Sequence, residues 1–176
     1  MPSINLNDEH YNTFFLTLKI VNDLNVFTSK KYFDIILNSL GYCQKNKGMH
    51  ILAFAILSNH LHLIFWIDEK VVLKDLVRDF KHFTASQILK QLKQDSQEQI
   101  LKIFNDLASK AFDRNYKVWR RTTHPEVLYS DKFLEQKIKY VDFNATHHNL
   151  TDNPEEYLYT SYHNHYCKHE PVLKLL

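Results

Sequence analysis

The first part of the chain contains three short apolar runs. An amphipathic stretch lies between the first run and the other two. Residues 13–20 (TFFLTLKI) are rich in aromatic and β-branched side chains, which favours a buried strand. Residues 49–57 and 60–67 have the same character, and only Ser58 and Asn59 separate them. Two strands joined by so short a break pair antiparallel. Short strands are also expected at residues 116–119 and 126–129.

Other segments carry apolar residues at helical spacing. Ser29 is expected to cap a helix over residues 30–46, and a long helix is expected from about Val71 to Lys93. The long helix has an apolar face made of Leu73, Leu76, Val77, Phe80, Phe83, Ile88, Leu89 and Leu92. Further helices are predicted at residues 97–110, after Ser130, and after Pro154 (EEYLYTSY). This mixture predicts an α+β fold with helices packed on an antiparallel central sheet.

Composition narrows the possible functions. The 176 residues, 44% of them hydrophobic, suit a single domain over residues 1–176. The only glycines, Gly41 and Gly48, lie too far apart for a Gly-rich phosphate loop, which excludes Rossmann and P-loop enzymes. The formal net charge of +2 leaves room for a local basic patch without requiring a nucleic-acid partner.

Location follows from what the chain lacks. Cys43 and Cys167 are far apart and match no metal spacing, which is typical of a reducing compartment. The N-terminal MPSINLNDEHYN has no apolar signal core, and no apolar run approaches the ~20 residues needed to cross a bilayer. We therefore expect a cytoplasmic protein without a membrane partner.

The segment with the clearest chemistry is His60-Leu61-His62. Residues i and i+2 of a strand point to the same face, so the two imidazoles project side by side, ~7 Å apart along the strand. Two imidazoles so placed can converge on one divalent cation. The alternative is that both are ordinary strand residues, as in a structural protein with unrelated chemistry.

The residues around this pair resemble a known family. AFAILSNHLHLIFWI resembles the H-U-H strand (U is a bulky apolar residue) of the single-tyrosine HUH transposases. The order of the other blocks is similar to that of the REP-associated tyrosine transposases. These blocks are LKDLVRDFKHFTASQIL, VWRRTTHPEVLYSDKFLEQKIKYV and the C-terminal NPEEYLYTSYHNHY. The resemblance implies a ferredoxin-like HUH endonuclease core and allows a homodimer.

It also implies a reaction. In the family two histidines and a third polar ligand hold Mg²⁺ or Mn²⁺, which polarises a scissile phosphate of single-stranded DNA. A tyrosine attacks and forms a 5′-phosphotyrosine, leaving a free 3′-OH. Family members recognise hairpins. By this resemblance His60 and His62 would hold the metal in a transposase that acts on hairpin-bearing single strands.

The nucleophile departs from the family pattern. The family's tyrosine follows a tryptophan that corresponds to Trp119, and here Thr123 or His124 occupies that place. His124 is therefore a candidate catalytic residue. Tyr116 and Tyr129 are the nearest tyrosines, and Tyr129 is preferred because it borders the predicted helix at Ser130.

Two interpretations follow from this departure. In the first, Tyr129 replaces the family tyrosine and the protein cuts DNA; in the second, a domesticated relative binds DNA hairpins without cutting them. Asp142 stands where the family often has a histidine, and could supply a hard oxygen ligand.

A basic patch is the candidate DNA contact. Lys74, Arg78 and Lys81 are spaced to share one face of the long helix. With Lys117, Arg120 and Arg121 they could contact phosphates. The alternative is a solvated charged surface.

Overall fold

A four-stranded antiparallel sheet forms the centre of the computed structural model, which describes residues 12–108, 115–168 and 170–175. The strands are β1 (Thr13–Lys19), β2 (Met49–Ile56), β3 (His60–Ile67) and β4 (Glu126–Val127), in the order β2-β3-β1-β4. β1 pairs with β3 along its whole length, from Thr13 opposite Trp66 to Lys19 opposite His60. The three long strands and the hairpin predicted from the sequence are confirmed.

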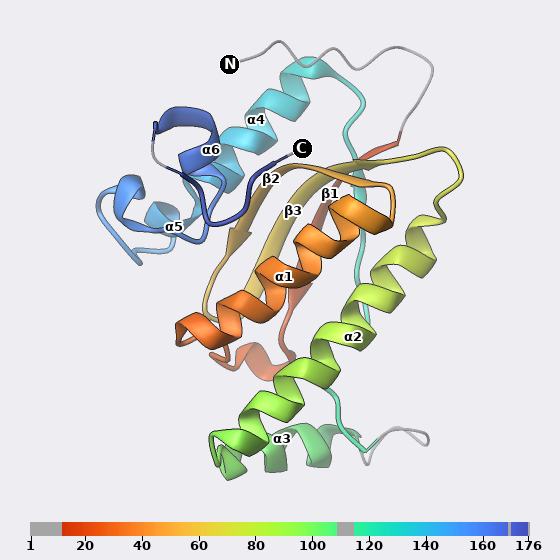
Figure 1. Cartoon of the computed structure of the whole chain (residues 1–176), viewed down its shortest axis with the longest axis vertical. Coiled ribbons are helices and arrows are strands. Elements are labelled where there is room, and N and C mark those ends of the chain that lie inside the picture. The colour runs from red at the N-terminus through yellow and green to blue at the C-terminus, as the bar shows by residue number, and fades with distance from the viewer. Residues whose placement is uncertain (1–11, 109–114, 169, 176) are drawn as a thin grey trace.

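Two helices cover one face of this sheet. α1 (Lys30–Asn46) connects β1 to β2, and α2 (Leu73–Gln94) follows β3, which is the split β-α-β-β-α-β arrangement of a ferredoxin-like core. A short 3-10 turn, η1 (Val21–Asp23), precedes α1, and α3 (Glu98–Ala108) packs against α2 (Figure 1). The predicted α+β class is confirmed.

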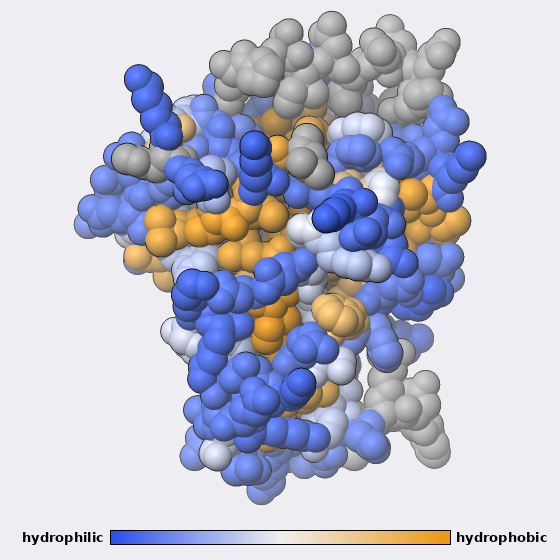
Figure 2. Space-filling view, in the orientation of Figure 1, coloured by the Kyte–Doolittle hydropathy of each residue, from blue (hydrophilic) through white to orange (hydrophobic). Residues whose placement is uncertain are grey.

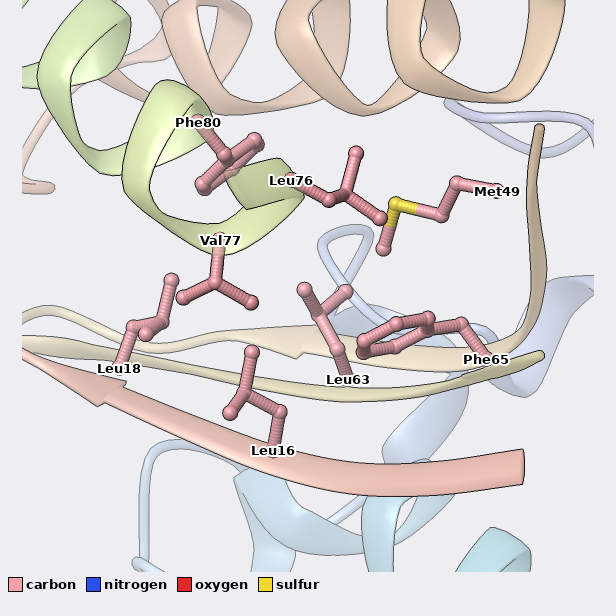
Figure 3. A pocket seen from close by; sticks show the side chains of 8 residues that line it. All are labelled: Leu16, Leu18, Met49, Leu63, Phe65, Leu76, Val77 and Phe80. Carbon is pink, nitrogen blue, oxygen red and sulfur yellow. The ribbon is translucent and has the colours of Figure 1, made fainter. Parts of the chain in front are cut away.

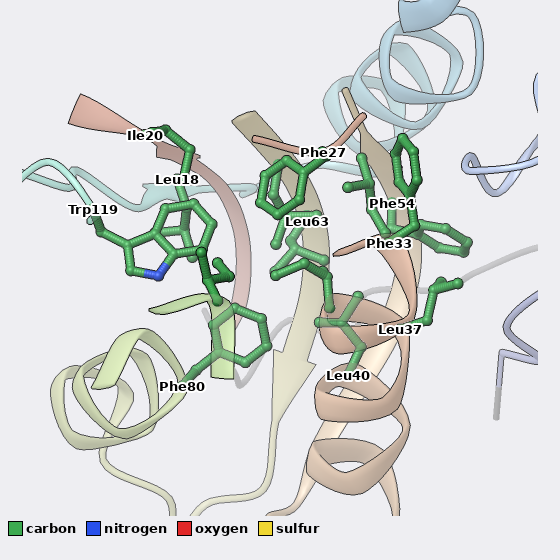
Figure 4. Close-up of a cluster of buried hydrophobic side chains, with 14 of the residues drawn as sticks. Leu18, Ile20, Phe27, Phe33, Leu37, Leu40, Phe54, Leu63, Phe80 and Trp119 are labelled. Carbon is green, nitrogen blue, oxygen red and sulfur yellow. The ribbon is translucent and has the colours of Figure 1, made fainter. Parts of the chain in front are cut away.

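Alternation along the strands decides which side chains meet these helices. Leu63 and Phe65 of β3, with Leu16 and Leu18 of β1, point toward α2 (Figure 3). A void of about 10 Å³ remains between them and α2, which is room for no more than one water molecule. The surrounding core is a single cluster of aromatic and aliphatic side chains (Figure 4). Trp119 joins it, and the indole Nε1 donates to Thr84 Oγ1 at 3.0 Å.

α4 (Asp131–Asp142) covers part of the opposite face, followed by the short α5 (Asn144–His147). Ser130 caps α4 as predicted, since its hydroxyl accepts from the Phe133 N–H at 3.3 Å. Apolar residues of α4 pack on a second cluster with the sheet, consisting of Ala53, Ala55, Leu57, Ile64, Leu128, Leu134, Ile138 and Val141. Apolar side chains therefore pack on both faces of the sheet, while the edge strand β4 is exposed.

The C-terminal segment corrects one prediction. Instead of the helix expected over EEYLYTSY, the chain forms a 3-10 turn, η2 (Pro154–Glu156), an extended stretch, and then α6 (Tyr162–Tyr166). The extended stretch lies along β2: the Ile56 N–H donates to Tyr159 O at 2.9 Å, and Thr160 bridges Ala55. The Tyr159 ring also stacks on Phe33 with centroids 3.6 Å apart. This pairing outweighs local helical preference.

Three smaller differences from the sequence predictions concern single residues or short segments. Residues 116–119 form no strand, and only an isolated bridge joins Trp119 to Ile20. Ser29 occupies the N-cap of α1, but its hydroxyl makes no capping hydrogen bond. Phe83, expected in the core, is 56% exposed.

The outer surface differs between regions of the view in Figure 2. It is hydrophilic over α3 and the end of α2, and hydrophobic side chains gather where α1 meets the C-terminal segment. None of the helices in the described parts of the chain is long and apolar enough to cross a bilayer.

Candidate active site

A pair of histidines lies at the start of β3. His60 and His62 point to the same side of the sheet, away from the large core, as strand alternation predicts. Their ring centroids are 4.8 Å apart and the rings are nearly perpendicular, at 86°. Both are buried, with 8% and 6% of their surface exposed.

Hydrogen bonds orient both rings. His60 Nδ1 lies 2.6 Å from Asn59 Oδ1, and His62 Nδ1 lies 2.8 Å from Thr17 Oγ1. A carbonyl oxygen only accepts, so the His60 Nδ1 carries the proton and its Nε2 keeps a lone pair. The Thr17 hydroxyl can hold His62 in the same tautomer. Such contacts on the far nitrogen are typical of imidazoles that bind metals.

Both imidazoles are neutral at neutral pH. Burial, together with the charges of His148 and Lys19, lowers the pKa of His60 to about 4. Burial likewise lowers the pKa of His62 to about 3, with repulsion from His60, His148, Lys19 and Lys137 adding to the effect. Neutral nitrogens are what a metal ion requires, since protons and metals compete for the same lone pair.

Aromatic rings and a third histidine surround the pair. Phe15 of β1 stacks on His62 with centroids 5.5 Å apart, and the Tyr140 ring of α4 meets His62 edge-on at 5.7 Å. His148, just after α5, has its ring 5.2 Å from that of His60. Tyr140 is 40% exposed, so its ring reaches both the histidine pair and solvent. Among the described residues, Tyr140 is the tyrosine whose ring contacts the histidine pair.

The structure gives the two catalytic residues predicted from the sequence, Tyr129 and His124, exposed positions near the start of α4 and before β4. Tyr129 is 68% exposed, and its ring lies 5.3 Å from Phe133 at the start of α4. His124 is exposed in the loop before β4. Among the described residues, neither has a ring contact with His60 or His62. Sequence reasoning missed Tyr140, although its position beside buried Val141 at the edge of the apolar face of α4 was a usable signal.

Asp142, considered as an oxygen ligand, has a different environment. Its side chain is fully buried; Ser161 Oγ donates to Oδ1 at 2.5 Å, and His165 Nδ1 lies 2.7 Å from Oδ2. Both carboxylate oxygens are therefore occupied. Within the described ranges, no group of three or more His, Cys, Asp or Glu residues is arranged to hold a metal.

Asn144 is a second residue that the sequence did not single out. It lies four residues after Tyr140, at the start of α5, just after the turn at Phe143 that ends α4. Its side chain is completely buried, and neither the amide oxygen nor the amide nitrogen has a hydrogen-bond partner. A buried, unpartnered carboxamide is costly, which points to a missing partner at this position.

The predicted basic residues fall on two parts of the fold. Arg78 of α2 pairs with Asp75 and Asp79 at 2.6 and 2.9 Å, and Lys74 is exposed on the same helix. Lys81 donates to the Arg120 carbonyl at 2.8 Å, which ties α2 to residues 120–123. In that region Arg120 pairs with Asp23, Arg121 is exposed and Lys117 is half-buried.

The chain is thus an α+β protein with a ferredoxin-like core, whose inner strand carries a histidine pair beside a tyrosine-bearing helix. Residues 20–127 match the family of IS200-like transposases. Because this match spans more than half of the chain, the protein belongs to that family.

Two solved structures are similar to the chain, and the first of them agrees with its fold. One is the structure of a REP-associated tyrosine transposase bound to a REP hairpin, with a TM-score of 0.65 and 12% sequence identity; the match covers 98% of this chain and 90% of that one. Another is a structure from Deinococcus radiodurans R1 described as a transposase, with a TM-score of 0.47, 15% identity and coverage of 73% and 87%. No curated protein matches the chain.

Proposed function

We propose that the protein is a metal-dependent endonuclease or transposase that cuts and joins single-stranded, hairpin-bearing DNA through a phosphotyrosine intermediate. The observation that supports this most is the buried, neutral histidine pair in contact with Tyr140. The structurally similar transposase is bound to a REP hairpin, which makes hairpin DNA the substrate to test first.

The residues present fit a divalent cation. His60 and His62 would supply two Nε2 lone pairs, and the unpartnered Asn144 amide would supply an oxygen. Imidazole nitrogen suits a softer cation than Mg²⁺, so between Mg²⁺ and Mn²⁺ these ligands favour Mn²⁺. A cation bound there would polarise the scissile phosphate. Water and phosphate oxygens would complete its coordination.

Tyr140 is the proposed nucleophile, ahead of Tyr129. Its hydroxyl oxygen forms a bond to phosphorus and gives its proton to water or a nearby base, while the bond from phosphorus to the 3′ oxygen breaks. The 3′ oxygen takes up a proton and leaves as a free hydroxyl. The phosphate stays attached to the 5′ end of the downstream strand, so a second strand can be joined without an added energy source.

The alternative is a protein that binds hairpins without cutting them. The observation that favours it is the presence of Thr123 and His124 at the place where the transposases that this chain resembles carry their tyrosine. Under this alternative Tyr140 packs beside His62 as a structural residue.

Covalent adduct formation tests the proposal. We expect the protein with Mn²⁺ and a labelled single strand that carries a hairpin to form an adduct stable to denaturation, and EDTA to abolish it. Tyr140→Phe should lose the adduct, while Tyr129→Phe, which removes a hydroxyl of the same kind 11 residues earlier, should keep it. Loss in Tyr129→Phe alone would instead make Tyr129 the nucleophile. Tight hairpin binding by the unmodified protein without any adduct would favour the binding-only alternative.

A further inference from the structure

The ammonium group of Lys137 is held in a fixed position beside the proposed site. Lys137 Nζ lies 4.5 Å from the centroid of the Phe15 ring and 5.3 Å from that of Phe133. Glu126 Oε2 of β4 accepts from Nζ at 2.7 Å. The Lys137 side chain is 23% exposed, so it is ordered by two rings and a carboxylate but is still open to solvent. Most surface lysines lack such restraint.

Phe15 links this cation to the site. The ring that Lys137 covers is the same ring that stacks on His62 at 5.5 Å and meets Tyr140 edge-on at 6.2 Å. The helix also places Lys137 near Tyr140. At 3.6 residues per turn, Lys137 lies about 60° around the helix axis from Tyr140, on the side of buried Val141.

We propose that Lys137 is a phosphate-binding residue of the active site, whose ammonium group contacts a non-bridging oxygen of the DNA phosphate that Tyr140 attacks. This inference rests on the proposed function and assigns a residue that supplies positive charge from the side of α4. A preorganised cation stabilises the charge that accumulates on the phosphoryl oxygens during transfer, at little cost in reorganisation. Lys139 differs: it is exposed, and about 200° separates it from Lys137 around the helix.

Glu126 forms an ion pair with Lys137 in the protein without DNA. Its carboxylate lies opposite Phe15 in the strand register, which places it on the same face of the sheet. A DNA phosphate has to compete with this carboxylate for Nζ. Removing the negative charge of Glu126 should therefore strengthen DNA binding, and this outcome distinguishes a phosphate-binding Lys137 from one that only braces β4 against α4.

The experiment compares Lys137→Met with Lys139→Met. Both variants lose one positive charge from the same helix, and Met keeps the apolar stem that packs on Phe15 and Phe133. We expect Lys137→Met to slow adduct formation at saturating DNA by about tenfold to a hundredfold, the usual effect of losing a charged hydrogen bond. The salt dependence of hairpin binding should also drop by about one unit of slope. Lys139→Met should retain the adduct rate of the unmodified protein.

The outcomes distinguish a failure of the proposed function from a failure of the role proposed for Lys137. If the unmodified protein forms no adduct, the proposed function fails, and the salt slope of binding still decides whether Lys137 contacts phosphate. If Lys137→Met and Lys139→Met give the same slope and the same rate, Lys137 is not a phosphate-binding residue. Should Lys137→Met fail to fold by circular dichroism, Glu126→Gln is the second variant: we expect tighter binding to the hairpin, and unchanged or weaker binding would overturn the inference.

Discussion

At the scale of single residues, the site depends on two buried imidazoles whose side-chain hydrogen bonds are to the uncharged Asn59 and Thr17. Desolvation disfavours their protonated forms, so each binds protons less readily when the protein is folded than when it is unfolded. The hydrogen bonds from Asn59 and Thr17 fix ring orientation but supply no negative charge. The consequence is a site that is ready for a metal and that carries a cost in stability at low pH.

That cost predicts a pH dependence. The unfolded chain binds protons at His60 and His62 below about pH 6.5, whereas the folded protein does so only near pH 4 and pH 3. Stability of the metal-free protein should therefore fall as pH is lowered from about 6.5 toward 4. Urea denaturation in EDTA at several pH values would show it. His62→Asn should have a flatter profile over this range, and a profile as steep as that of the unmodified protein would contradict the assignment.

At the scale of elements, α4 is tied to the sheet near its C-terminal end. Ser161 accepts from the Phe54 N–H of β2 at 3.0 Å and donates to Asp142 of α4 at 2.5 Å, so one hydroxyl joins the C-terminal segment, the strand and the helix. Tyr140 lies two residues before Asp142. The position of the proposed nucleophile over His62 is therefore set partly by a contact with the C-terminal segment.

Ser161→Ala tests this connection. The substitution leaves the buried Asp142 carboxylate short of one donor, and we expect a loss of about 1–3 kcal/mol in the free energy of unfolding. Adduct formation should also slow, because α4 is less firmly held. Thr122→Ala, which removes a hydroxyl from an exposed loop residue, serves as the control for denaturation measurements. Equal stability of the two variants would show that the Ser161 contact is dispensable.

At the scale of the whole molecule, the sheet separates two sides with different roles. α1, α2 and the large core occupy one side, and the histidine pair and α4 occupy the other. The predicted basic residues are spread between α2 and the segment after Trp119, where the Arg120 N–H donates to Lys19 O at 2.8 Å. Lys19 lies opposite His60 in the sheet, so the backbone of Arg120 lies near the edge of the site, whereas Arg78 lies on the helix of the other layer.

We propose that Lys74, Arg78, Lys81, Lys117, Arg120 and Arg121 contribute unequally to hairpin binding. Arg121→Ala should weaken binding modestly and lower its salt dependence by about one unit of slope. Arg78→Ala should have a smaller effect, because its guanidinium already pairs with Asp75 and Asp79 and must leave them to meet a phosphate. Titration of labelled hairpin DNA at two salt concentrations measures both. A larger effect for Arg78→Ala would place the DNA on the α2 side instead.

The sequence by itself determined the parts of this protein that depend on local periodicity. Alternation over residues 60–67 was enough to put His60 and His62 on one face, because neighbouring side chains of a strand always point to opposite sides. Helical spacing was enough to locate α1, α2 and α4. Helical spacing failed at Phe83. The buried stripe of α2 continues from Phe80 through Thr84 and Ile88, and Phe83 lies about 60° around the helix from Phe80 in the other direction.

Only the tertiary structure decided which tyrosine meets the histidines, how Asp142 is used and what the segment after Pro154 does. Tyr140 reaches His62 because α4 packs across the sheet, and the extended stretch at Tyr159 exists because the edge of β2 offers it hydrogen bonds. Asp142 binds Ser161 and His165 through the fold of the C-terminal segment. These contacts join residues up to about a hundred positions apart along the chain, and local backbone preferences carry no information about such distant partners.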